Sequence, residues 1–152
     1  MAREAGCSPV VVVLGAECAH VLRNSSLEDA VTVVNDQWKG GMGSSIRLGV
    51  RTLEVAGKDV DGVVLMTCDQ PAVTAQHLRL IAAEEEVNAS QYACRKGVPA
   101  YFPAKCFDML LALRGDVGAR ELLVDAPSEN LMDGELDVDT LDDLQRARVL
   151  FG

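Results

Sequence analysis

The residues of this sequence with the clearest chemical potential are carboxylates that follow predicted strands. Asp69 comes shortly after the apolar run Gly62–Met66, which predicts a buried strand. Because ligands of open α/β sheets bind beyond the carboxyl ends of the strands, Asp69 is well placed to hold a metal ion over the sheet edge. The alternative is that Asp69 only caps the next turn by accepting a backbone N–H bond. Its position alone favours neither interpretation.

A second pair of carboxylates, Asp137 and Asp139, precedes the last predicted helix. If the segment is extended, both side chains point to the same face. Taken alone, the pair is better explained by Thr140 capping the helix while the aspartates favour its positive N-terminus. Together with Asp69, however, the pair indicates a divalent cation, since Mg²⁺ takes few protein ligands and keeps room for phosphate oxygens.

A third segment with chemical content runs from Asn35 to Arg47 and contains the glycine loop Gly40–Gly43. Glycines allow close approach of a ligand, and the N-terminus of the following helix, capped by Ser44 or Ser45, favours anions. Asn35 can read a base edge or hold the loop. The alternative is an ordinary connecting loop, and the segment lacks the Lys-Ser/Thr ending of a P-loop.

Alternating strands and helices must position these residues. The patterns predict strands at 10–14, 31–34, 62–66, 90–94, 98–102 and 130–132, and helices at 16–23, after 44–45, after 74, at 105–113, through 122–123 and after 140. This alternation predicts one α/β domain over residues 1–152 with a mainly parallel sheet, in which residues 1–8 fray. Pro99 indicates an edge strand or a bulge, 95–97 a turn, and Leu141, Leu144 and Leu150 the anchors of the last helix.

Composition excludes several classes of protein. The chain has 152 residues, 49% of them apolar, which fits a folded domain, and its net charge of −9 argues against a nucleic-acid partner. The apolar run Pro9–Leu14 is too short to span a membrane. Five cysteines without a Cys-x-x-Cys pair indicate reduced thiols in a cytoplasmic protein.

Six segments, in order, resemble one family. They are Val10–Gly15; Asn35-x-x-Trp38-x-x-Gly41-Met42-x-Ser44-Ser45-x-Arg47-x-Gly49; Cys68-Asp69-Gln70-Pro71-x-x-Thr74; Gly97-Val98-Pro99-x-x-Phe102-Pro103; Arg114-Gly115-Asp116-x-Gly118-Ala119-Arg120-x-Leu122-Leu123; and Asp137-x-Asp139-Thr140-x-x-Asp143-Leu144. This succession is similar to the molybdopterin (molybdenum cofactor) cytidylyltransferase and guanylyltransferase-like NTP transferases. Single segments are weak signals, but six in this order are specific.

The resemblance implies a three-layer Rossmann-like nucleotidyltransferase domain and a role for each segment. Asp69 and Asp139 would be catalytic Mg²⁺ ligands, with Asp137 assisting. The nucleotide would be bordered by Asn35, Gly41, Gly43, Ser44 and Ser45. The acceptor would be bordered by Gly97, Pro99, Gly115, Asp116 and Gly118. The implied reaction transfers a nucleotidyl group from an NTP, with CTP preferred and GTP possible, to a molybdopterin-type phosphate.

The sequence departs from the family in one major respect. The family opens with a strand and a loop of the form Leu-Ala-Ala-Gly-x-Ser-x-Arg-Met-Gly that grips the triphosphate, and nothing here matches it. The resemblance therefore implies an N-terminally truncated domain with an unpaired strand edge. The alternatives are a non-catalytic binding or regulatory relative, or a fragment. The oligomeric state does not follow from the sequence.

Overall fold

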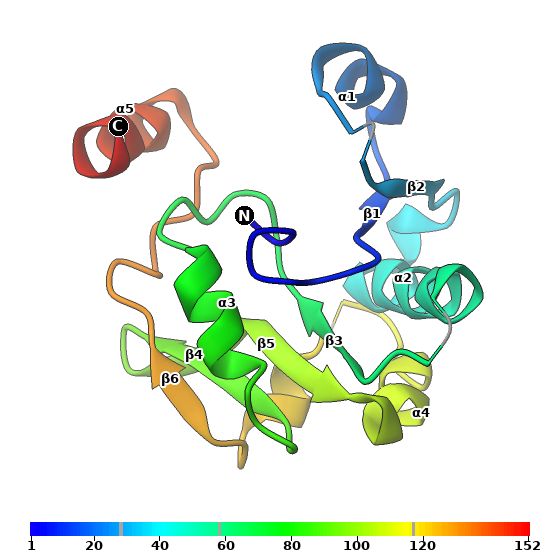
Figure 1. Cartoon of the computed structure of the whole chain (residues 1–152). Coiled ribbons are helices and arrows are strands. Elements are labelled where there is room, and N and C mark those ends of the chain that lie inside the picture. Colours follow the sequence, from blue (N-terminus) through cyan, green and yellow to red (C-terminus); the bar gives the residue numbers. More distant parts are fainter. Residues whose placement is uncertain (28, 58, 117) are drawn as a thin grey trace.

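The computed structural model describes residues 1–27, 29–57, 59–116 and 118–152. Its α-helices and strands alternate along most of the chain (Figure 1). In order they are β1 (Val11–Leu14), α1 (Cys18–Asn24), β2 (Val31–Val34), α2 (Met42–Ala56), β3 (Gly62–Leu65), α3 (Ala75–Ile81), β4 (Asn88–Tyr92), β5 (Arg95–Pro103), α4 (Phe107–Leu111), β6 (Ser128–Asn130) and α5 (Leu141–Phe151). Short 3-10 helices cover Trp38–Gly40, Ala104–Cys106 and Arg120–Leu123.

The strands form two sheets. β1 and β2 pair in parallel, and a second sheet has the order β3-β5-β4-β6. In this second sheet β4 and β6 are parallel, whereas β5 runs antiparallel to both of its neighbours, β3 and β4. The α/β class is confirmed, and the second sheet is mixed because β4 and β5 form a hairpin.

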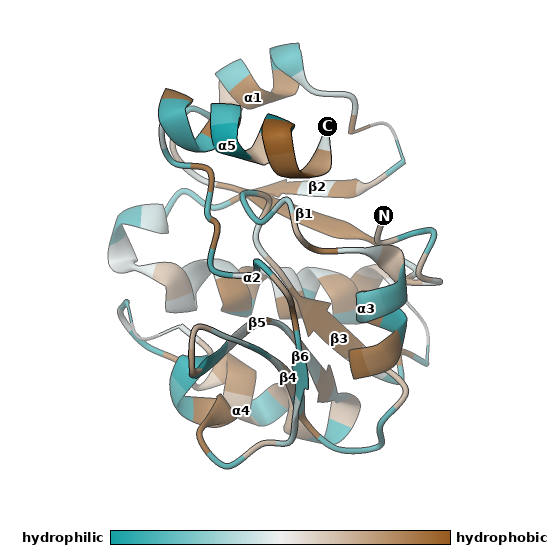
Figure 2. Cartoon of the chain, turned by 90° about the vertical axis from the view of Figure 1, so that its left-hand side faces the viewer, coloured by the Kyte–Doolittle hydropathy of each residue, from teal (hydrophilic) through white to brown (hydrophobic). Residues whose placement is uncertain are grey.

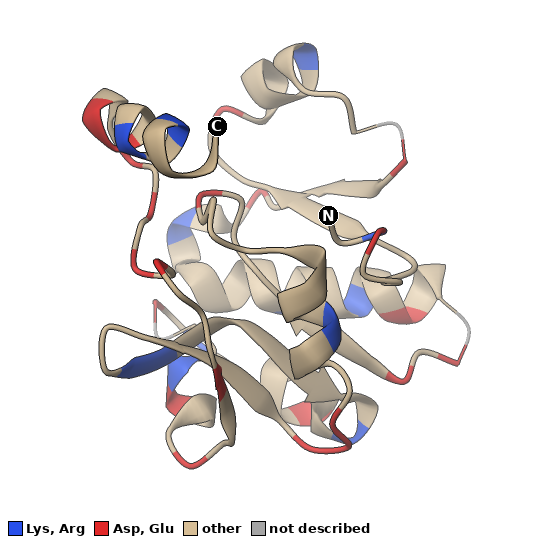
Figure 3. Cartoon of the chain, turned by 60° about the vertical axis from the view of Figure 1, so that its left-hand side comes forward, with Lys and Arg blue, Asp and Glu red and all other residues tan. Residues whose placement is uncertain are grey.

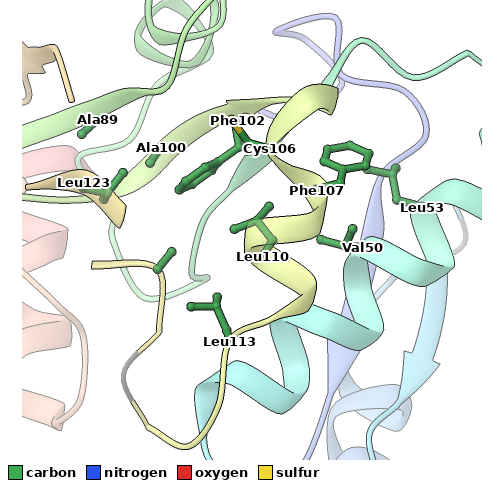
Figure 4. Packing of buried hydrophobic residues seen from close by; sticks show 11 residues of the cluster. Val50, Leu53, Ala89, Ala100, Phe102, Cys106, Phe107, Leu110, Leu113 and Leu123 are labelled. Carbon is green, nitrogen blue, oxygen red and sulfur yellow. The ribbon is translucent and has the colours of Figure 1, made fainter. Parts of the chain in front are cut away.

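Helices cover both faces of the larger sheet, which gives three layers. On one face Phe102 of β5 packs with Val50 of α2 and Leu110 of α4 (Figure 4), and all three side chains are almost completely buried. On the other face Leu78 and Ile81 of α3 pack with Tyr92 of β4. Alternate side chains of β3 pack against the two clusters on opposite faces of the sheet, as expected for a strand.

β1 and β3 each have a strand partner on one side only, within the described ranges. Their runs of valine and leucine, which predict strands covered on both faces, are mostly half-buried. β2 also leaves Val31 and Val34 more than a third exposed. Figure 2 shows that these strands are largely hydrophobic (brown). Both sheets thus present an unpaired edge of apolar residues.

The first residues form hydrogen-bonded turns, where the sequence predicts a frayed end. The Ala5 N–H donates to the Met1 carbonyl over 2.9 Å, and the Arg79 guanidinium of α3 donates to the Glu4 carbonyl over 2.7 Å. Ala2 and Ala5 pack against the cluster beneath α3.

The β4–β5 hairpin corrects one prediction and confirms another. Its turn lies at Ala93 and Cys94, whose φ angles of 45° and 59° match the positive values of a tight hairpin turn, so Arg95–Gly97 belongs to β5. Opposite the adjacent residues Ala89 and Ser90, β5 carries an insertion that contains Pro99. The predicted bulge is therefore confirmed. The other alternative, an edge strand, does not apply because β5 is an inner strand, and the bulge removes the need for a proline N–H.

One of two predicted helix starts differs from the structure. α2 begins at Met42, after Gly41, so neither Ser44 nor Ser45 is its N-cap. α5 begins as predicted, with a capping box between Thr140 and Asp143, and the Thr140 hydrogen bonds lower the pKa of Asp143.

The predicted anchors of α5 are wrong in part. Leu141 and Leu150 are 78% and 55% exposed, and Ala147 is the buried residue of this helix. Figure 1 shows α5 standing apart from the larger sheet. No helix in the described ranges is long and apolar enough to cross a membrane.

The buried side chain of His77 in α3 predicts how the stability of the fold depends on pH. Ser90 Oγ donates to the Pro99 carbonyl over 2.6 Å, so it accepts from His77 Nε2 at 2.8 Å, which requires a proton on Nε2. Burial lowers the His77 pKa below 6.5, against a weaker opposing effect of Glu129. The unfolded chain thus binds a proton more readily, so stability is full above the unfolded pKa and is lost as pH falls through 6.5 towards the folded value.

We expect His77→Gln, which can still donate to Ser90, to flatten this acid-side loss. The measurement is the thermal midpoint of both proteins between about pH 8 and pH 5. Parallel curves for the two proteins would contradict a contribution from His77.

Candidate functional site

The candidate site lies where the loop after β3 meets the segment before α5. The Val138 N–H donates to the Asp69 carbonyl over 2.8 Å, which places these two distant segments side by side. Figure 3 shows a succession of acidic positions along the chain between β6 and α5. The carboxylates that the sequence singles out separately, Asp69 and the pair Asp137 and Asp139, are therefore brought to one place.

The side chain of Asp69 has a buried oxygen atom that lacks a hydrogen-bond donor in the described part of the chain. Its Oδ1 atom is buried and accepts no hydrogen bond from the described residues. The predicted alternative, a capping role for this carboxylate, would have supplied such a bond for at least one oxygen. A buried carboxylate oxygen without a donor is costly, and a bound cation would satisfy it.

The pKa of the neighbouring carboxylate, Asp137, is shifted at this edge. Its pKa is raised, first by partial burial and then by the negative charges of Asp69 and Asp139, while Arg95 opposes the shift. The negative charges of Asp69 and Asp139 therefore act on Asp137, and Arg95 opposes them. Because no three His, Cys, Asp or Glu side chains in the described ranges converge closely enough to hold a metal themselves, a cation here would need additional ligands such as phosphate oxygens or water.

Asn35 holds the glycine loop together. Its side-chain amide donates to Ser44 Oγ at 2.8 Å and to Ser45 Oγ at 3.0 Å, and its Oδ1 accepts from the Gln37 N–H at 3.0 Å. The side chain is 4% exposed. Of the two roles that its position allows, the contacts support the one that shapes the loop, since no donor is left to read a base.

The loops predicted to border the nucleotide and the acceptor contact each other. The Gly43 N–H donates to the Gly115 carbonyl over 3.0 Å, and the Met42 N–H donates to Asp116 Oδ1 over 3.2 Å. The Arg47 guanidinium also donates to the Leu113 carbonyl. The N-terminus of α2, which the sequence predicts to favour a ligand anion, therefore already holds the Asp116 carboxylate of this chain.

This contact requires glycine at position 41. Gly41 has φ 90° and ψ 172°, a region that is essentially restricted to glycine, and a Cβ there would collide with the Gly115 backbone. We expect Gly41→Ala to lower the free energy of unfolding by at least about 2 kcal/mol, measured by urea denaturation. Gly40→Ala is the matched control because a Cβ at Gly40 meets open space. Equal stability of the two variants would contradict the close packing of these loops.

Two other predicted acceptor residues, Gly97 and Pro99, lie in β5, and both are buried. Pro99 is almost fully buried, and its carbonyl accepts the Ser90 hydroxyl, so it shapes the bulge and touches no ligand in this conformation. Gly97 faces Tyr92, and a Cβ at Gly97 would collide with the Tyr92 hydroxyl. Gly118, with φ 60°, lies against Met42 and continues the loop contact described above.

Three residues near the carboxylates were not predicted. Arg95 supplies the positive charge that acts on Asp137, and its guanidinium lies 5.6 Å from the centre of the Tyr92 ring. Gln70 is buried directly beside Asp69. The sequence could have indicated Gln70, because it lies in the Cys68–Pro71 motif. Nothing in the sequence connects Arg95 or Tyr92 with this edge.

Two hollows of the described surface lie away from the carboxylates. One is lined by residues 22–27 and Thr32, and the other lies between the end of α2 and the start of α4.

Comparison with known proteins decides the family. Residues 1–130 match the MobA-like NTP transferase domain. The chain belongs to this family of nucleotidyltransferases. It is 35% identical over 117 residues to the purine catabolism protein PucB of Bacillus subtilis, a match that covers 71% of the chain and 56% of PucB. It is 30% identical to the nicotine blue oxidoreductase of Paenarthrobacter nicotinovorans, over 93% of the chain and 76% of that protein.

Similar solved structures confirm the fold. The manganese complex of Rv0371C from Mycobacterium tuberculosis H37Rv is 32% identical, with a TM-score of 0.75 over 96% of the chain and 80% of that structure. A nucleotidyl transferase from Methanothermobacter thermautotroptrophicus superposes with a TM-score of 0.76 at 22% identity, over 98% of the chain and 76% of that structure. The chain thus spans just over half of PucB and about four fifths of the Rv0371C structure.

Proposed function

We propose that this domain transfers a nucleotidyl group from a nucleoside triphosphate to a phosphorylated acceptor. A divalent cation would be bound by Asp69 and Asp139, with Asp137 assisting and with phosphate oxygens or water as further ligands. The observation that carries the proposal is the buried Asp69 Oδ1 atom without a hydrogen bond, beside two further carboxylates. The manganese in the related Rv0371C structure supports a divalent ion, and we propose Mg²⁺ as the physiological one.

In the proposed reaction an acceptor phosphate oxygen attacks the α-phosphorus of the triphosphate. The bond between that phosphorus and the bridging oxygen to the β-phosphate breaks, and pyrophosphate leaves with the electron pair. When bound, the cation would neutralise charge on the phosphates. Asp69 and Asp139 would hold it, with Asp137 assisting, and the carboxylates would lose their mutual repulsion when it binds.

For the substrates, we propose CTP as the preferred nucleotide, GTP as the second, and a molybdopterin-type phosphate as the acceptor. The motif succession from Asn35 to Asp143 supports this choice by its resemblance to the molybdenum cofactor enzymes. The 35–45 and 113–118 loops, which the structure packs together, would border the two substrates. We also propose a cytoplasmic location, which the five cysteines without a Cys-x-x-Cys pair support.

A non-catalytic binding relative is the second candidate, and one observation favours it. Asp116 occupies the N-terminus of α2, where a ligand anion would otherwise bind. Such a protein would retain the acceptor-bordering loops and bind without turnover.

The test is pyrophosphate release from CTP or GTP with Mg²⁺ and molybdopterin, together with calorimetric titration of each nucleotide and of the acceptor. Turnover with one nucleotide supports the transferase. Acceptor binding without turnover supports the binding relative, and no binding of any substrate contradicts both.

A further inference from the structure

Gln70 is a buried polar side chain whose amide is fully engaged. The side chain is 6% exposed, and its Oε1 atom accepts from the Thr67 hydroxyl at 3.4 Å. Its Nε2 atom donates twice, to the Gly134 carbonyl over 3.2 Å and to the Tyr92 hydroxyl over 3.3 Å. Both N–H groups are therefore used, and each reaches a different part of the chain.

The bond to Gly134 holds one end of the acidic segment. The other end is held by the Val138 N–H, which donates to the Asp69 carbonyl. Two neighbouring residues of one loop, Asp69 and Gln70, thus fix the segment that carries Asp137 at both of its ends. These two hydrogen bonds keep the segment that carries Asp137 beside Asp69.

The bond to Tyr92 extends the connection to the acceptor side. The Tyr92 hydroxyl donates onward to the Val98 carbonyl over 3.1 Å, at the bulge of β5. Gly97 packs directly against the same hydroxyl. One amide therefore lies between the carboxylate edge and the strand that carries two of the predicted acceptor residues.

We infer that Gln70 is the positioning residue that brings the Asp137–Asp139 segment to Asp69, so that both segments reach one divalent cation. The inference rests on the proposed function, because it requires the cation at these carboxylates. Gln70 would not contact the cation. It would act through its hydrogen bond to Gly134 and through the loop that it shares with Asp69. Partners that orient the ligands of a metal typically change its affinity about 10–100-fold when they are removed.

The test is the affinity of the full chain for Mn²⁺ alone, measured by calorimetry and by water-proton relaxation. Gln70→Met keeps the length of the side chain and removes all of its hydrogen bonds, and we expect Mn²⁺ to bind about 10–100-fold more weakly. Tyr92→Phe removes one bond of the same amide but leaves Gly134 in place, so its affinity should stay within about twofold of the unmodified chain.

A milder variant keeps the test possible if the Gln70→Met protein does not fold. Thr67→Val is close to isosteric and removes only the bond that orients Oε1, and we expect Mn²⁺ affinity to fall about two- to fivefold. The thermal midpoint without metal separates the two possible roles. A purely structural role would lower the midpoint and leave the Mn²⁺ affinity of the folded variants unchanged.

The outcomes also separate this inference from the proposed function. If Asp69→Asn loses Mn²⁺ binding while both the Gln70 and Thr67 variants bind as the unmodified chain does, the positioning role is overturned and the cation site stands. If Asp69→Asn binds Mn²⁺ with unchanged affinity, the cation site itself is wrong.

Discussion

Asp69→Asn is expected to remove the stabilisation of the chain by Mn²⁺ while leaving the metal-free protein at least as stable as before. Asparagine lacks the negative charge that a cation needs, and it relieves the repulsion that raises the Asp137 pKa. For the unmodified chain, Mn²⁺ at about 100 times its dissociation constant adds about 2.7 kcal/mol to the free energy of unfolding. For a domain of this size that is a rise of roughly 5–10 °C in the thermal midpoint.

The control for this prediction is Asp125→Asn, which removes one exposed carboxylate and should leave the Mn²⁺ effect intact. A second readout is the Asp137 pKa, which should fall towards 3.8 in Asp69→Asn when followed by NMR titration. A Mn²⁺-induced rise of equal size in both variants would show that the ion binds elsewhere.

Phe102→Ala is expected to have the largest effect on stability. The ring is completely buried between α2, α4 and the larger sheet (Figure 4), so its removal leaves a cavity in the main cluster. Substitutions of this kind cost about 3–5 kcal/mol. The thermal midpoint should fall by roughly 10 °C.

Phe151→Ala is the matched control for Phe102→Ala. This second phenylalanine lies near the end of α5 and is 43% exposed, so its truncation should change the free energy of unfolding by less than about 1 kcal/mol. Both proteins are compared by urea denaturation. A similar loss for the two variants would contradict the position of the core.

The sequence predicts the elements well where the signal is local. The valine-rich runs locate β1, β2 and β3 because β-branched side chains favour strands. Thr140 and Asp143 predict the start of α5 because a capping box uses only neighbouring backbone groups. Asp69 stands out for the same reason, as a carboxylate that follows a fully apolar strand.

Other features depend on partners far apart in the chain and could not be predicted. The start of α2 is set by Gly115 and Asp116, more than 70 residues away, so a search for a nearby cap selects the wrong serines. The exposure of Leu141 and Leu150 also follows from tertiary packing, since a helical stripe alone does not say what it faces.

The sequence by itself determined the α/β class, the family resemblance and the chemical nature of the carboxylates at 69, 137 and 139, because residue types and local spacing carry that information. Only the tertiary structure decided that these carboxylates share one edge, that Asn35 and Asp116 bind their own chain, and that Gln70 joins Gly134 to Tyr92. The physical reason is that hydrogen bonds and charge repulsion act over a few ångströms in space, whatever the separation of the residues along the chain.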